Sequence, residues 1–166
     1  ITAQVTGENS WTLTFSTSLE NMSGAQIAIG SPTTKGRENA GYGGLFWRGL
    51  RSFTDGRLVT TDTIGTGNDV RGQRHEWMAF EGKHDHIDAT SLVLMLDDTR
   101  NPHHPPQWFA RSEEFAALNP APFFSEEVVI PAGESATFRY GVGIADGVAA
   151  DAPALAEAVR GILAKD

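Results

Sequence analysis

Apolar and polar residues alternate along much of this chain with the period of a β-strand. In residues 11–19 the odd positions are mostly apolar, whereas every even position is Ser or Thr. Such alternation is typical of a strand with one buried face. Residues 21–24 have the composition of a turn, and residues 26–29 can follow as a second strand. We therefore expect the chain to begin with a hairpin-like pair of strands.

The segment SLVLML, residues 91–96, is a nearly continuous apolar run of strand length. A run of this kind predicts a central strand that is covered on both faces. Shorter apolar segments predict strands at residues 57–61, 77–80 and 108–111, the first of them at a sheet edge. Residues 119–122 are predicted to turn the chain.

Two apolar segments near the end of the chain flank the sequence PAGES. Residues 126–130 and 136–145 have strand patterns, and the Pro-Gly turn between them predicts a hairpin. A helix is predicted over residues 151–165, with Asp151 as N-cap and Pro153 in its first turn. An apolar stripe at helical spacing marks its buried face: Leu155, Val159, Ile162 and Leu163.

These elements predict a mainly β fold with a single domain over residues 1–166. The expected architecture is an antiparallel β-sandwich with one C-terminal amphipathic helix packed on its edge. No apolar run approaches the ~20 residues of a membrane-spanning helix. The chain begins with Ile1 and shows no signal peptide, so we expect a processed or truncated product and a cytoplasmic location.

Composition narrows the functional classes. The 166 residues include 13 Lys and Arg against 21 Asp and Glu, a formal net charge of −8. This balance argues against a nucleic-acid partner, which requires a basic face. There are no cysteines, so disulfides, thiolate catalysis and cysteine-based metal centres are excluded. Any metal would have to bind His and carboxylate groups.

One stretch of the chain combines glycines, aromatic rings and arginines. Residues 37–48 read RENAGYGGLFWR, and aromatic faces and guanidinium groups suit the apolar face and the hydroxyls of a sugar. We expect Tyr42, Trp47 and Arg48 to form part of a polyol-binding wall. The alternative is that Phe46 and Trp47 are core residues and the glycines form bulges at a sandwich corner. Strand alternation places these two rings on opposite faces, so one can be core and the other site.

A second stretch, residues 97–111, holds His103 and His104 between prolines directly after the predicted central strand. Prolines would present these side chains rigidly at one end of the sheet. Histidine with a carboxylate supplies general acid–base catalysis, with Glu38, Glu76 and Glu126 as candidate partners. We expect the two stretches to lie at one rim of the sandwich and to enclose a polar pocket.

A metal site is an alternative use of the histidines. His84 and His86 would lie on one side of an extended segment, and with His103 they could bind a divalent metal. The favoured interpretation is that they are solvated turn residues, so no cofactor is expected.

The chain resembles the PmoA family of bacterial proteins, described as methane oxygenase PmoA-like. The matching strings are SPTTKGRENAGYGGLFWRG with RSFTDG, RHEWMAFEGKHD, LDDTRNPHHPPQWFARSEEFAALNPAPFF and PAGESATFRYGVGIADG. They span residues 11–147, and the most specific is N-P-x-H-P-x-x-W-x-x-R at residues 101–111. The resemblance implies a β-sandwich about twice this length, of which this chain is the C-terminal half, associated with sugar-catabolic oxidoreductases.

The resemblance adds Asn101, Trp108 and Arg111 to the expected substrate-binding residues. The expected catalytic residues are His104, His103 and Glu38. The function expected is action on, or binding of, a sugar or oxidised sugar, as in mutarotase-like sandwiches. A non-catalytic carbohydrate-binding subunit and a metal-dependent oxygenase are the alternatives. A companion chain or a second copy of this chain is the expected protein partner.

Overall fold

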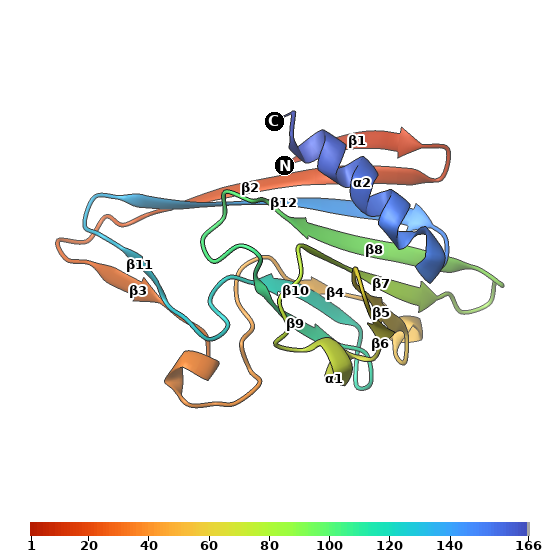
Figure 1. Ribbon diagram of the computed structural model, residues 1–166, viewed down its shortest axis with the longest axis horizontal. Helices are drawn as coiled ribbons and strands as arrows, with labels where there is room; N and C mark the ends of the chain where they lie inside the picture. Colours follow the sequence, from red (N-terminus) through yellow and green to blue (C-terminus); the bar gives the residue numbers. More distant parts are fainter. Residues whose placement is uncertain (166) are drawn as a thin grey trace.

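The computed structural model describes residues 1–165 and is mainly β, as predicted (Figure 1). Its largest element is an antiparallel sheet of seven strands. In spatial order these are β1 (Thr2–Gly7), β2 (Ser10–Glu20), β12 (Ser135–Asp146), β8 (Thr90–Asp97), β7 (Trp77–Lys83), β5 (Arg57–Val59) and β6 (Ile64–Gly65). The predicted central strand is confirmed, because β8 pairs with β12 on one side and β7 on the other.

Two smaller sheets and a few short helices complete the fold. One sheet has the order β4 (Trp47–Arg48), β10 (Ala117–Ala121), β9 (Gln107–Arg111), and the other pairs β11 (Val128–Ile130) with β3 (Ile27–Ile29). The helices are η1 (Thr33–Lys35), η2 (Arg51–Phe53), α1 (Gly67–Val70), η3 (Ala149–Asp151) and α2 (Ala152–Leu163). The turn expected at residues 119–122 is wrong in part, because residues 117–121 form β10.

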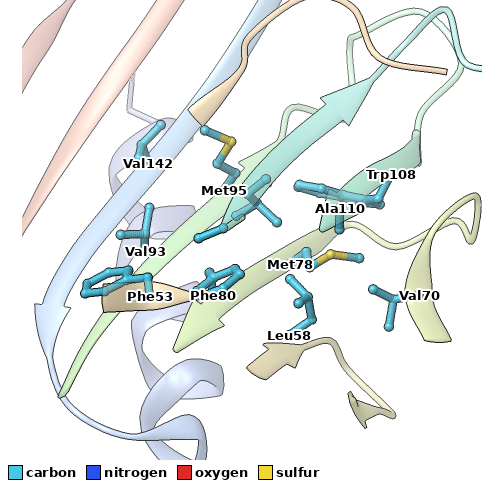
Figure 2. Close-up of a cluster of buried hydrophobic side chains, with 12 residues drawn as sticks. Phe53, Leu58, Val70, Met78, Phe80, Val93, Met95, Trp108, Ala110 and Val142 are labelled. Atoms are coloured by element: carbon cyan, nitrogen blue, oxygen red, sulfur yellow. The ribbon is translucent and has the colours of Figure 1, made fainter. Parts of the chain in front are cut away.

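Strand alternation divides the core into two layers on either side of the large sheet. Val93 and Met95 face the three-stranded sheet and pack with Phe80 and Trp108 (Figure 2). The intervening residues of β8 face the opposite way and pack against α2. The continuous apolar run of β8 therefore results from burial on both faces.

The helix α2 lies across the face of the large sheet, not on its edge as predicted (Figure 1). Gly141 and Gly143 of β12 permit this contact, because a Cβ atom at either position would overlap Val159 of α2. Pro153 lies in the first turn as expected, but Asp151 does not cap α2 with its side chain. Its carboxylate instead accepts a hydrogen bond from Val148 N at 2.9 Å, at the start of η3.

Neither predicted hairpin forms. β2 does not pair with β3, and β11 does not pair with β12; instead β2 pairs with β12 and β3 with β11. Asn21 ties the two connecting turns together, since its amide Nδ2 donates to Ala25 O and Ile130 O, both at 2.8 Å. The two turns therefore stack, and β3 and β11 leave the large sheet together as a separate ribbon (Figure 1).

Part of the large sheet faces no second layer. Val5 of β1 and Trp11 of β2 are paired neighbours on the same face as Met95, and they are 85% and 43% exposed. This face is therefore apolar beyond the area that the three-stranded sheet covers. No helix among residues 1–165 has the length and hydropathy needed to cross a membrane.

The close contact between β12 and α2 gives a stability prediction. Gly141→Ala should lower the free energy of unfolding by about 1–3 kcal/mol, because the added methyl group overlaps Val159. Urea denaturation measures the change, with Gly161→Ala on α2 as control, where an added Cβ contacts nothing within 4 Å. The double variant Gly141→Ala, Val159→Ala should lose less stability than the sum of the single changes. Strictly additive losses would contradict this packing.

Candidate functional site

A buried carboxyl group ends the central strand. Asp97 is the last residue of β8, and its side chain is only 2% exposed. Asn101 Nδ2 donates a hydrogen bond to Asp97 Oδ1 at 2.7 Å, and His104 Nδ1 lies 2.7 Å from Asp97 Oδ2. Both carboxyl oxygens therefore have a partner, which a buried carboxyl requires.

The same residues hold the proline-rich loop, residues 98–106, against β12. The side-chain amide of Asn101 accepts a hydrogen bond from Arg139 N at 2.7 Å and donates one to Arg139 O at 2.6 Å. These two bonds to the backbone of β12 resemble those between paired strands. Asp98 receives charge-assisted hydrogen bonds from Arg100 and Arg139. The loop is thus fixed from both sides, and His104 has little freedom to leave Asp97.

Burial raises the pKa of Asp97 to about 6. Loss of hydration is the main cause, and the hydrogen bonds from Asn101 and His104 partly oppose it. A carboxyl group with this pKa exchanges a proton near neutral pH, which is unusual outside functional sites. The His104 side chain is 16% exposed, so the imidazole joins the buried carboxyl to the surface.

Side chains of β12, the strand paired with β8, line a cavity of about 450 Å³, and neither Asp97 nor His104 is among its lining residues. Its wall is formed by β2, β12 and two loops and is mainly aromatic and aliphatic: Phe15, Thr17, Leu19, Gly44, Leu45, Phe46, Pro122, Phe123, Phe138 and Tyr140. This volume falls in the range of small-molecule sites, which are typically apolar with few polar groups.

Tyr140 connects the cavity to the Asp97–His104 pair. Tyr140 and Asp97 are direct cross-strand partners, so their side chains leave the same face of the sheet about 5 Å apart at Cβ. Burial and the charge of Asp97 both raise the pKa of the Tyr140 hydroxyl. Within residues 1–165 this buried hydroxyl has no hydrogen-bond partner. The Tyr140 hydroxyl lies close to Gly44, because a Cβ atom added at Gly44 would be 3.8 Å from the hydroxyl oxygen.

His103 points away from Asp97 and has a separate set of contacts. Its Nδ1 lies 2.9 Å from Pro122 O, its Nε2 lies 3.9 Å from Glu126, and Arg74 donates to its carbonyl oxygen at 3.0 Å. His103 therefore lies near its candidate partner Glu126, but at 3.9 Å the two groups are beyond hydrogen-bond distance. The other candidate, Glu76, pairs with Arg160 on α2. Because Pro122 also lines the cavity, His103 supports the cavity wall from outside.

Glu38 lies away from both histidines. It is exposed on the loop after η1, and within residues 1–165 it forms no ion pair with either of them. The carboxylate that meets His104 is Asp97. The sequence indicated this residue only as part of a polar cluster after β8.

Two of the three aromatic residues expected to bind substrate, Trp47 and Trp108, belong to the core, which corrects their assignment. Trp108 is fully buried, and its indole Nε1 donates to His75 O at 2.8 Å. Trp47 packs on Phe80 with ring centroids 5.4 Å apart. The prediction that Phe46 and Trp47 lie on opposite faces is confirmed, because Phe46 is 42% exposed and lines the cavity.

Tyr42, Arg48 and Arg111 meet on the outer face of the three-stranded sheet. Arg48 and Arg111 flank Ala117 in the strand register, and both guanidinium groups lie over the Phe115 ring. Tyr42 packs edge-on against Phe109 on the same face. The expected substrate-binding residues therefore divide into three groups: Asn101 beside Asp97, the two tryptophans in the core, and these three residues on the outer face.

The two predicted stretches do meet, but not around a polar pocket. Asn119 of β10 holds the glycine-rich stretch, donating to Gly43 O at 2.9 Å, while His103 of the other stretch contacts Pro122 just beyond β10. The cavity is lined by Gly44, Leu45 and Phe46 of the first stretch but by no residue of the second, and its wall is mainly apolar. Both stretches therefore contact β10 or the residues just after it, so they lie on the same side of the fold as expected. The expectation that they enclose a polar pocket is wrong.

The histidines of the metal alternative do not share a site. His84 and His86 lie in the β7–β8 turn and His103 lies beyond the other end of β8. The eight residues of β8 span roughly 25 Å. His84 Nε2 is instead 2.8 Å from Ser91 Oγ. Among residues 1–165 no three His, Asp or Glu side chains are arranged to bind a metal ion.

The raised pKa of Asp97 predicts a specific pH dependence of stability. Between about pH 4 and pH 6 the folded protein keeps a proton on Asp97 that the unfolded chain has lost, so raising the pH across this range destabilises the fold. Asp97→Asn should abolish this loss. Urea denaturation of both proteins at about pH 4 and about pH 7 measures the difference. Parallel stability profiles would contradict the raised pKa.

Comparison with known proteins identifies a family whose function is unknown. No curated protein and no solved structure matches the chain. A family model described as "Family of unknown function (DUF6807)" matches residues 1–160. The resemblance to the PmoA family stays a prediction. Because the match covers nearly the whole chain, this protein belongs to the DUF6807 family.

Proposed function

We propose that this protein binds a sugar or an oxidised sugar in the aromatic cavity and acts on it through the Asp97–His104 pair. One observation supports this proposal most strongly: a buried carboxyl with a pKa of about 6 is hydrogen-bonded to a partly exposed histidine, and its cross-strand neighbour Tyr140 lines the cavity. A carboxylate that orients imidazole in this way is a recurrent acid–base arrangement.

The cavity suits a ring-shaped ligand. Phe15, Phe46, Phe123 and Phe138 surround a volume of about 450 Å³, which exceeds that of a single small sugar. Aromatic faces pack well against the apolar C–H face of a sugar ring. Thr17 provides a hydroxyl, and movement of Gly44 would bring a ligand oxygen to the unpartnered hydroxyl of Tyr140.

The proposed chemistry is a proton exchange at a sugar oxygen. When Nδ1–H of His104 donates a hydrogen bond to the Asp97 carboxylate, Nε2 carries the lone pair and takes the proton of the anomeric hydroxyl of the ligand. The charge that develops on the imidazolium is stabilised by the Asp97 carboxylate. Transfer of the proton to the ring oxygen accompanies cleavage of the bond between C1 and that oxygen and leaves an open-chain aldehyde. Ring closure on the other face of the aldehyde, by the reverse proton transfers, completes the anomerisation.

A second candidate is binding without catalysis. The observation that favours it is that no charged side chain lines the cavity, so ligand binding there does not require His104. The protein would then be a carbohydrate-binding accessory subunit. The third alternative, a metal-dependent oxygenase, has no convergent ligand set among residues 1–165 to support it.

The remaining parts of the proposal concern partners and location. The exposed apolar residues Val5 and Trp11 support association with a companion chain or a second copy of this chain. The net charge of −8 disfavours nucleic acid. The absence of cysteine supports the cytoplasm as the compartment.

Filling the cavity should abolish ligand binding. Thr17→Trp places an indole in the cavity, whereas Ser18→Trp places the same group on the opposite face of β2. Saturation-transfer NMR with D-glucose, D-galactose, D-xylose and D-glucuronate should show binding to the parent and the Ser18 variant only. Absence of binding to the parent protein would reject the proposed cavity, as would equal binding to both variants.

Removing His104 separates catalysis from binding. His104→Ala should slow exchange between sugar anomers, followed by NMR on the same four sugars, by about 100-fold or more while binding persists. Free imidazole should restore part of the rate, and His86→Asn in the β7–β8 turn should leave it unchanged. An unaltered rate in His104→Ala would reject the catalytic role of His104 and leave binding as the only proposed function.

A further inference from the structure

We propose that a second cleft, on the outer side of the three-stranded sheet, binds the carboxylate or phosphate group of a small molecule. The cleft has a volume of about 280 Å³ and lies between η2 and the segment that joins β9 to β10. Arg48, Arg51, Thr54 and Phe115 line it. This inference does not depend on the function proposed for the aromatic cavity.

Arg48 is held in place before any ligand arrives. Its guanidinium carbon lies 4.1 Å from the centroid of the Phe115 ring, a short cation–π contact that restrains the group. The backbone of Arg48 is fixed as well, since it pairs with Ala117 of β10. A fixed guanidinium loses little conformational freedom when it binds an anion.

The positive charge of the cleft is not neutralised by the protein. Within residues 1–165 no carboxylate lies at ion-pair distance from Arg48 or Arg51. Glu114, the acidic residue at the cleft, pairs with Arg111 instead. With Glu114 engaged by Arg111, two guanidinium groups at the cleft have no carboxylate partner among residues 1–165, and an anion between them would relieve their repulsion.

The chemistry of the lining indicates the class of ligand. Guanidinium groups match the planar, two-oxygen geometry of a carboxylate or a phosphate. Thr54 offers a hydroxyl donor, and Leu50, which is 61% exposed, offers apolar contact. The volume and this lining fit a small molecule with one oxyanion group and a short apolar part.

Titration with two simple anions tests this inference and identifies the preferred group. Inorganic phosphate and malonate are added to the parent protein, and binding is followed by calorimetry and by NMR of the arginine side chains. We expect one of the two to bind saturably at a single site. Arg48→Gln and Arg51→Gln should each weaken this binding by about tenfold or more.

Arg37→Gln, at an exposed position on another loop, is the matched control and should bind as the parent does. Circular dichroism and the thermal midpoint verify that each variant is folded. Saturation by phosphate alone indicates a phosphorylated ligand, and saturation by malonate alone indicates a carboxylic acid. Failure of both anions to saturate would overturn the inference, and so would an equal loss in the Arg37 variant.

Discussion

A carboxyl group that ends a buried strand must be hydrogen-bonded or protonated, and this constraint determines the surroundings of Asp97. Its two oxygens are occupied by Asn101 and His104, and these contacts fold the proline-rich loop back onto β12. The loop position, the orientation of the imidazole and the pKa of about 6 all follow from this one burial. Without Asp97, the histidine would be an ordinary loop residue beside an apolar cavity.

The layered architecture determines which side chains are available for function. The central strand β8 is buried on both faces, so its polar side chains become available for function only at its end, where Asp97 meets the proline-rich loop. The aromatic cavity opens where the three-stranded sheet no longer covers β2 and β12. The arginine cleft lies beyond the opposite, outer face of that small sheet. The neighbouring residues Trp47 and Arg48 lie on opposite faces of the three-stranded sheet, so Trp47 packs against the core and Arg48 faces the cleft.

Periodicity predicted the elements that local sequence determines, and it failed where pairing depends on distant residues. The long strand at residues 11–19, the buried strand at 91–96 and the C-terminal helix were all predictable. The hairpins were not, because Asn21 bonds to Ile130, 109 positions away, and redirects both turns. His104 was identified from its prolines, whereas Asp97, Tyr140 and the cavity required tertiary structure. Trp108 was misassigned because an aromatic residue in a functional-looking motif equally fills a core.

The carboxyl titration of Asp97, followed by ¹³C NMR in the folded protein, is the most direct test of this account. The account predicts a midpoint near 6. An ordinary midpoint near 4 would contradict it. In that case the carboxyl would be hydrated rather than buried, and the proposed acid–base pair would not exist.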